Sequence, residues 1–333
     1  MGRHHARKYA ELPGAELVGV VDRDSERRDV VAEKHTCLGL NSIAELIKAG
    51  VDAVSIAVPT ADHLACASEL LEAGVACLIE KPLANDPDEA ARMVEIANRT
   101  GAVLMVGHIE RYNPAVRALQ RAQESMAAEG HEGIVPRFIE VHRVSPMTFR
   151  SVDVSVVMDM MIHDLDVVLM LMGGAEPDEV SASGVPVLTE HEDVCNARLT
   201  FHMPHGRCVA NLTASRLALK TERKIRIIGE NGYVSIDYAT KKGMLIRRTA
   251  NEIQMQEIRQ ALRNGADLSE LDYSNVVVIE PLEIDQQDQL ELEIKEFLEA
   301  VRTGGRPPID AQAGFANVRT AHRIMAEARK DWI

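Results

Sequence analysis

Short apolar segments alternate with helical segments between residues 15 and 108, and this alternation restricts the folds that the chain can adopt. Predicted strands lie at 15–22, 51–60, 75–79 and 102–108. Strands that alternate with helices favour a parallel sheet with right-handed crossovers. The sequence therefore predicts an α/β domain, in which ligands bind in the crevice beyond the carboxyl ends of the strands.

The strand at 75–79 is followed directly by Glu80, Lys81 and Pro82. A lysine at the carboxyl end of a buried strand is placed to act on a ligand in that crevice. The proline after it limits the backbone and can fix a cis peptide bond. The alternative is a solvated strand end, with Pro82 opening the next helix.

The amino-terminal residues have the pattern of a dinucleotide-binding βαβ unit without its first strand. A helical segment leads into the strand at 15–22, which ends in Asp22. An acid at this position normally holds the ribose 2′-hydroxyl of NAD, whereas the neighbouring Arg23 could accept the 2′-phosphate of NADP. We expect NAD, with NADP as the weaker alternative.

Gly2 would be the last glycine of the phosphate-binding fingerprint, the one that lets helix and strand pack closely. The strand that normally comes first, and the remaining glycines, are not in the sequence. We therefore expect that the chain begins late, inside its own phosphate loop. The alternative is a chain that simply starts with a helix.

A further predicted cofactor contact follows the strand at 51–60, which is closed by Pro59 and Thr60. His63 comes at the start of the next helix. A loop at this strand end can touch the nicotinamide ribose, so we expect Pro59, Thr60 and His63 to border the cofactor. His63 could equally be a surface histidine in the first helical turn.

The pattern changes after a helix near 114–128. Predicted strands follow at 138–144, 180–187, 194–202, 207–215, 224–228 and 233–238. From residue 180 on they are too closely spaced for intervening helices, which indicates one large, mostly antiparallel sheet. Residues 240–285 are predicted as a loop or strand excursion, and helices are predicted at about 286–303 and 311–330. We place a dinucleotide-binding domain at 1–115 and a substrate and oligomerisation domain at 116–333, with the last helix able to pack back on the first domain.

One long helix, predicted at 153–172, carries Asp159 and His163 among apolar residues. Residues four apart share one face of a helix. Neither side chain can lie unpaired in a core without a large cost, so each must face a cavity, the other residue or a ligand. A histidine oriented by a carboxylate is a candidate general base. The alternative is a buried Asp–His hydrogen bond that holds the helix to the sheet.

Composition excludes several classes of function. The formal net charge is −14 and no basic block is present, so a nucleic-acid partner is not expected. No apolar run is long enough to cross a membrane. The five cysteines are odd in number and form no C-x-x-C pair, which argues against disulfides and a metal site and favours the cytoplasm.

Three features together resemble the glucose–fructose oxidoreductase / inositol dehydrogenase (GFO/IDH/MocA) family across essentially the whole chain. They are Glu80-Lys81-Pro82, the Asp159-x-x-x-His163-Asp164 helix and the order of the nucleotide domain. The resemblance implies a Rossmann domain, here apparently lacking its first strand. It also implies an α+β domain with a large open, mostly antiparallel sheet that often serves the contacts of a homo-oligomer, a dimer or tetramer.

The resemblance further implies that Lys81 and His163 serve hydride chemistry on a sugar or cyclitol alcohol with NAD, and that Asp159 lies beside them. Glu80 and Lys81 would border the cofactor, while Lys81, Asp159 and His163 would meet the substrate. An NAD-assisted glycoside hydrolase and a non-catalytic dinucleotide or sugar sensor stay open as alternatives.

The stretch 107–114, Gly-His-Ile-Glu-Arg-Tyr-Asn-Pro, is similar to the branch that acts on nucleotide sugars such as UDP-N-acetylglucosamine at the 3-hydroxyl. Arg111 and Asn113 would then meet the sugar or its phosphate. The alternative is that both residues only fix the hinge between the domains.

Overall fold

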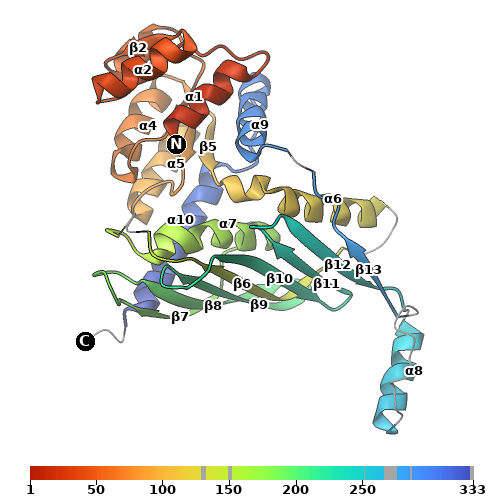
Figure 1. Ribbon diagram of the computed structural model, residues 1–333. Coiled ribbons are helices and arrows are strands. Elements are labelled where there is room, and N and C mark those ends of the chain that lie inside the picture. The colour runs from red at the N-terminus through yellow and green to blue at the C-terminus, as the bar shows by residue number, and fades with distance from the viewer. Residues whose placement is uncertain (129–132, 149–151, 251, 266–275, 286, 331–333) are drawn as a thin grey trace.

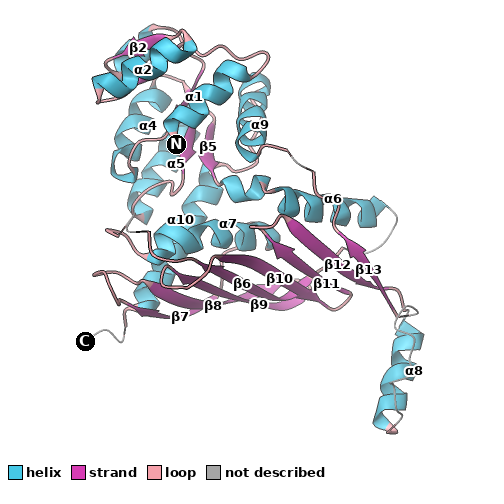
Figure 2. Ribbon diagram, viewed as in Figure 1, coloured by secondary structure: helices cyan, strands magenta, loops and turns pink. Residues whose placement is uncertain are grey.

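The computed structural model describes residues 1–333 except 129–132, 149–151, 251, 266–275, 286 and 331–333 (Figure 1). Short strands lie among helices in the amino-terminal part, and a broad sheet forms the other part (Figure 2). Helices α6 (Pro114–Ala128), α7 (Ile162–Leu171) and α10 (Ala311–Ala328) lie between the two parts, along one face of the broad sheet.

The amino-terminal part has the predicted alternation of strands and helices. Its elements are α1 (Gly2–Glu11), β1 (Gly19–Val21), α2 (Ser25–His35), β2 (Leu38–Leu40), α3 (Ile43–Lys48), β3 (Ala53–Ile56), η1 (Thr60–Asp62), α4 (His63–Glu72), β4 (Ala76–Glu80), α5 (Pro87–Thr100), β5 (Leu104–Gly107) and η2 (Ile109–Tyr112). Its strand pairs are parallel. The predicted parallel α/β sheet is therefore confirmed.

Local sequence explains where these helices begin and end. The side chains of Asp24, Ser42 and Asp86 each accept a backbone N–H at a helix start. Such caps satisfy donors that have no partner inside the helix. Pro87 occupies the first position of α5, where its missing N–H costs nothing, and Gly101 ends that helix with φ 72°.

The parallel strands form two separate sheets, β1-β2 and β3-β4-β5. In a Rossmann sheet the first strand lies between the strands that correspond here to β1 and β3. Within the described part of the chain, no strand pairs with the facing edges of β1 and β3. The domain thus has the Rossmann order without its first strand, as expected.

The second sheet has eight strands in the order β13-β12-β11-β10-β6-β9-β8-β7. All neighbours are antiparallel except β6 and β9, which are parallel. The strands are β6 (Pro136–Val144), β7 (Glu179–Val185), β8 (Val194–Met203), β9 (Gly206–Ser215), β10 (Glu222–Gly229), β11 (Gly232–Asp237), β12 (Lys242–Arg248) and β13 (Val277–Pro281). The large, mostly antiparallel sheet is confirmed.

Two segments differ from their predicted structure. The poorly patterned stretch at 240–285 contains two strands and the helix α8 (Glu252–Arg263), which projects from the end of the sheet in Figure 1. The helix predicted at 153–172 is found from Val157 to Leu171, but its first part, η3 (Val157–Met161), is a π-helical turn that runs directly into α7. Turns of this kind inside helices are frequent at functional sites, and apolar periodicity does not reveal them.

Buried side chains form two clusters, one in each part. The first surrounds β4, where Cys77, Leu78 and Ile79 are fully buried, and the second packs α7 on the large sheet. Helix α9 (Gln289–Thr303) contributes Ile294 and Phe297 to the first cluster. Both carboxyl-terminal helices therefore return to the Rossmann part, although only the last was expected to. The domain boundary at residue 115 stays a prediction.

Candidate active site

The site is built where β4 and β5 end side by side. Glu80 pairs with Gly107 in the parallel register, so Lys81 and His108 are the next residues of neighbouring strands. The Lys81–Pro82 peptide bond is cis. The carboxyl ends of these strands face the helices that join the two parts of the molecule, which is where an open α/β sheet binds its ligands.

Lys81 connects this strand end to the π-helical turn. Its Nζ donates a hydrogen bond to the backbone carbonyl oxygen of Asp159 at 3.0 Å. Burial lowers the pKa of Lys81, while the negative charges of Asp159 and Glu80 oppose that shift. An ammonium on the first domain is thereby held against a helix of the second.

His163 lies on the first turn of α7 and is only partly buried, although its Nδ1 atom is buried. Burial lowers the pKa of His163 well below 6.5, and the positive charges of Lys81 and Arg143 lower it further. The imidazole is therefore neutral near pH 7 and can accept a proton. Lys81 also contacts Asp159, four residues before His163, so the lysine is near enough for its charge to lower the pKa of the histidine.

The alternative of a buried hydrogen bond between Asp159 and His163 finds no support in the described part of the chain. Among the described residues, His163 Nδ1 has no hydrogen-bond partner. Asp159 instead takes part through its main chain, as the acceptor for Lys81.

His108 is a residue that the sequence reasoning passed over. Its side chain is 1% exposed, and neither ring nitrogen has a partner in the described part of the chain. Burial lowers the pKa of His108. The negative charge of Asp166 opposes this shift, and the positive charge of Arg111 adds to it. The available signal was its position, since His108 ends a buried strand just as Lys81 does.

His63 is locked into the backbone around the site. Its Nδ1 lies 3.1 Å from the carbonyl oxygen of Pro82 and 3.2 Å from that of Leu83, and its Nε2 lies 3.1 Å from that of Val58. Both ring nitrogens lie within hydrogen-bond distance of main-chain carbonyl oxygens, and a neutral ring donates to them from one nitrogen. His63 is 1% exposed, so the alternative of a surface histidine is wrong, and its contacts tie two strand-end loops together. Pro59 and Thr60 lie in the first of these loops, at the start of η1.

Arg111 and Asn113 form part of the joint between the domains. Arg111 donates to both carboxylate oxygens of Asp166, through Nε at 2.7 Å and Nη2 at 2.6 Å. Asn113 donates to Glu110 and accepts the backbone N–H of Ala115. These contacts favour the hinge role over a direct role in substrate binding.

A buried ion cluster includes Asp164, the residue that follows His163 in α7. Arg143 Nη2 donates to Asp164 and to Glu110, each at 3.0 Å. All three side chains are nearly inaccessible. The cluster holds β6, α7 and the segment after β5 together, because an unpaired charge at this depth would be very costly.

The predicted cofactor residues at the amino end fit a dinucleotide. Helix α1 begins at Gly2 with no side-chain cap and no acid in its first turn, which leaves its amino-terminal N–H groups and positive dipole end suited to a pyrophosphate. Asp22 directly follows β1 and accepts the N–H of Asp24, while Arg23 pairs with Asp62 at 2.9 Å. An aspartate at this strand end, with the arginine turned to another acid, fits a ribose 2′-hydroxyl better than a 2′-phosphate.

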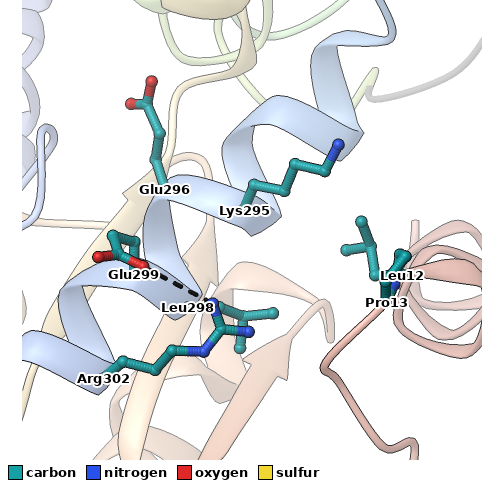
Figure 3. Close-up of a pocket in the computed structure, with 7 residues that line it drawn as sticks. All are labelled: Leu12, Pro13, Lys295, Glu296, Leu298, Glu299 and Arg302. Atoms are coloured by element: carbon teal, nitrogen blue, oxygen red, sulfur yellow. Dashed lines mark ion pairs between the residues drawn. The ribbon is translucent and has the colours of Figure 1, made fainter.

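Figure 3 shows a separate hollow between the end of α1 and α9. Its lining includes Leu12, Pro13 and the ion pair of Arg302 with Glu299 at 3.6 Å. This hollow lies away from Lys81 and His163, and its charged residues carry no arrangement suited to hydride chemistry.

Membrane-spanning helices, metal clusters and cysteines bear on the wider chain. Over the described ranges, no helix is long and apolar enough to span a bilayer, and no three His, Cys, Asp or Glu side chains gather as a metal site would require. All five cysteines are free thiols.

Comparison with known proteins agrees with this geometry. Residues 1–108 match the profile of the "Oxidoreductase family, NAD-binding Rossmann fold", and residues 143–235 match the "GFO/IDH/MocA C-terminal domain". The chain is 36% identical over 302 residues to UDP-N-acetylglucosamine 3-dehydrogenase of Acidithiobacillus ferrooxidans, covering 90% of this chain and 85% of the relative.

Solved structures extend the comparison. A structure of that Acidithiobacillus ferrooxidans enzyme superposes with a TM-score of 0.82 at 35% identity, covering 98% of this chain and 93% of the other. The WlbA dehydrogenase of Bordetella pertussis, in complex with NADH and UDP-GlcNAcA, superposes with a TM-score of 0.74 at 20% identity, covering 98% and 92%, which shows a shared fold. The chain belongs to the GFO/IDH/MocA family of NAD-binding oxidoreductases.

Proposed function

We propose that the chain is an NAD-dependent dehydrogenase that oxidises the 3-hydroxyl of UDP-N-acetylglucosamine. The observation that supports this proposal is the bond from Lys81 Nζ to the carbonyl of Asp159, four residues before His163, whose pKa is lowered by burial and by the charge of Lys81. The activity of the Acidithiobacillus ferrooxidans relative supports the choice of substrate.

His163 would accept the hydroxyl proton. Its Nδ1 is buried and has no hydrogen-bond partner among the described residues, so Nε2 is the nitrogen that we assign to meet the substrate. The low pKa keeps the ring neutral near pH 7, and the tautomer with its proton on Nδ1 leaves Nε2 free to accept. General-base catalysis of this kind contributes typically 10²–10⁴-fold.

Lys81 would polarise the reacting oxygen. One of its three N–H donors is used on Asp159, which leaves the others for the substrate alcohol. A fixed positive charge stabilises the negative charge that develops on that oxygen, and it needs no reorganisation during the reaction. The backbone of Asp159 would hold the lysine in place.

Gly2, Asp22 and the strand-end residues Pro59, Thr60 and Glu80 would hold the cofactor, with His63 supporting the loop around it. NAD, when bound, supplies the hydride acceptor. For Arg111 and Asn113 we propose the hinge role that their contacts support.

The test is incubation of the protein with NAD and a panel of UDP-sugars while NADH absorbance is followed. Accumulating NADH with UDP-N-acetylglucosamine supports the proposal. An NAD-assisted glycoside hydrolase would release UDP or sugar without accumulating NADH, and a sensor would bind a ligand without turnover.

We also propose a homo-oligomer and a cytoplasmic location, the latter from the five free thiols. Size-exclusion chromatography with light scattering tests the oligomer, and cell fractionation tests the location.

A further inference from the structure

A chain of hydrogen bonds links helix α1 to the residue that precedes Lys81. Tyr9 Oη lies 2.9 Å from Ser55 Oγ, which lies 3.1 Å from His5 Nδ1. His5 Nε2 lies 2.8 Å from Glu80 Oε1. The chain crosses three elements, α1, β3 and β4, and it ends at the mouth of the site.

The direction of these bonds follows from the chemistry of the groups. A carboxylate only accepts, so His5 Nε2 must carry a proton and donate to Glu80. In the neutral ring Nδ1 then accepts from Ser55, whose oxygen accepts from Tyr9. Burial raises the pKa of Tyr9, which keeps that hydroxyl protonated as the first donor. Every donor therefore points toward Glu80.

The fold leaves room for this arrangement. Ser55 pairs with Leu78, so Ser55 and Glu80 lie on the same face of the sheet. A Cβ on Gly107 would lie 3.3 Å from Glu80 Cα and 3.5 Å from its carboxyl carbon. Glu80 is thus held between an imidazole on one side and a glycine on the other, and His5 is 2% exposed.

We infer that His5 is a positioning residue, which acts through Glu80 to fix the strand end that carries Lys81. The inference rests on the proposed function, because it assigns His5 to the same reaction. It also joins the two halves of the cofactor site, since α1 begins at Gly2 and β4 ends at Glu80. A merely structural histidine would support folding without setting the position of Lys81.

The first experiment compares His5→Leu, His5→Gln and wild-type enzyme under conditions where circular dichroism shows each to be folded. We expect His5→Leu to lower kcat by at least tenfold with little change in KM for the sugar. His5→Gln should recover most of the loss, because its amide can still donate to Glu80. Ser55→Ala and Tyr9→Phe should have progressively smaller effects, since they lie further along the chain.

The second experiment adds Glu80→Gln. If His5 acts through Glu80, the double variant His5→Leu/Glu80→Gln should lose no more kcat than Glu80→Gln alone. Losses that multiply, or a His5→Leu variant with wild-type kcat, would overturn the inference.

A third measurement does not depend on the substrate. Reductive methylation of Lys81, followed by peptide mass spectrometry, should be several-fold faster in His5→Leu than in wild type, with the more exposed Lys295 as internal control. An unchanged Lys81 rate in folded His5→Leu overturns the inference even if no sugar of the panel is oxidised. The absence of turnover in wild-type protein overturns only the proposed function.

Discussion

Lys81, at the end of β4, donates a hydrogen bond of 3.0 Å to the main-chain carbonyl of Asp159, in the π-helical turn before α7. The bond spans 78 positions of sequence and joins the Rossmann part to the sheet part. It places a cation beside the turn that leads into α7, the helix that carries His163.

The pH dependence of turnover should report His163. Its pKa lies well below 6.5, and a general base must be unprotonated to act. We expect kcat/KM to be at its plateau at pH 7 and to fall only below 6.5, because acid protonates the imidazole. A pH–rate profile with NAD and UDP-N-acetylglucosamine measures this limb. A midpoint above 6.5 would contradict the assignment, and His163→Asn should abolish the limb.

Glu293 should limit stability at neutral pH. Both of its carboxylate oxygens are buried without a partner among the described residues, and burial raises its pKa well above 4.5. A raised carboxyl pKa makes the folded state lose stability as pH rises above the unfolded value. Near pH 8, Glu293→Gln should therefore raise the free energy of unfolding, measured with urea, by about 1–3 kcal/mol relative to wild type. Near pH 4 this difference should be smaller.

The matched control for that variant is Glu299→Gln on the same helix, where the side chain is exposed and pairs with Arg302. It should change stability by less than about 1 kcal/mol. Equal effects of the two substitutions, or a Glu293→Gln variant less stable than wild type at neutral pH, would show that Glu293 has a partner.

The buried cluster behind the site should be essential for folding. Among the described residues, Asp164→Leu leaves Arg143 with Glu110 as its one charged partner, in a nearly inaccessible position. Removing one member of a buried pair costs about 3–5 kcal/mol. Glu140→Gln, which breaks the more exposed pair with Arg226 on the same sheet, should cost less than about 1 kcal/mol. Urea unfolding of both variants decides; similar losses would rule out the buried cluster as the dominant contribution.

Two buried histidines, His63 at the start of α4 and His108 directly after β5, should respond in opposite ways to substitution. His108 has no hydrogen-bond partner for either ring nitrogen among the described residues, whereas both nitrogens of His63 face carbonyl oxygens. His108→Leu should keep or raise the melting temperature, because it removes a polar group that is buried without a partner. His63→Leu should cost about 1–3 kcal/mol. Calorimetry of the pair measures the contrast, and a destabilised His108→Leu would reveal a structural role for His108.

The features of the fold that depend on local sequence patterns could be predicted from the sequence. Alternating apolar and helical segments gave the parallel sheet, and Asp86 with Pro87 marked the start of α5. The lysine at the end of a buried strand lies in the site, and the peptide bond before Pro82 is cis, as that proline allowed.

The features that the sequence did not predict depend on tertiary contacts. His5 and Glu80 are 75 positions apart, and nothing in the pattern of α1 reveals their bond. The amphipathic face of α9 predicts burial but not that the helix packs against α1 and η2. The π-helical turn at Asp159 also escaped prediction, because apolar residues on most faces of the segment at 153–172 are compatible with both kinds of helix.

The most direct test of the central claim is a double-substitution cycle on Lys81 and His163. NADH formation from UDP-N-acetylglucosamine would be measured by stopped flow for wild type, Lys81→Ala, His163→Ala and the double variant, with NADH binding followed separately by fluorescence. Residues that act as a unit are strongly non-additive, so each single variant should lose at least about 10²-fold in kcat and the double variant little more. Wild-type turnover in either single variant, with cofactor binding intact, would contradict the account.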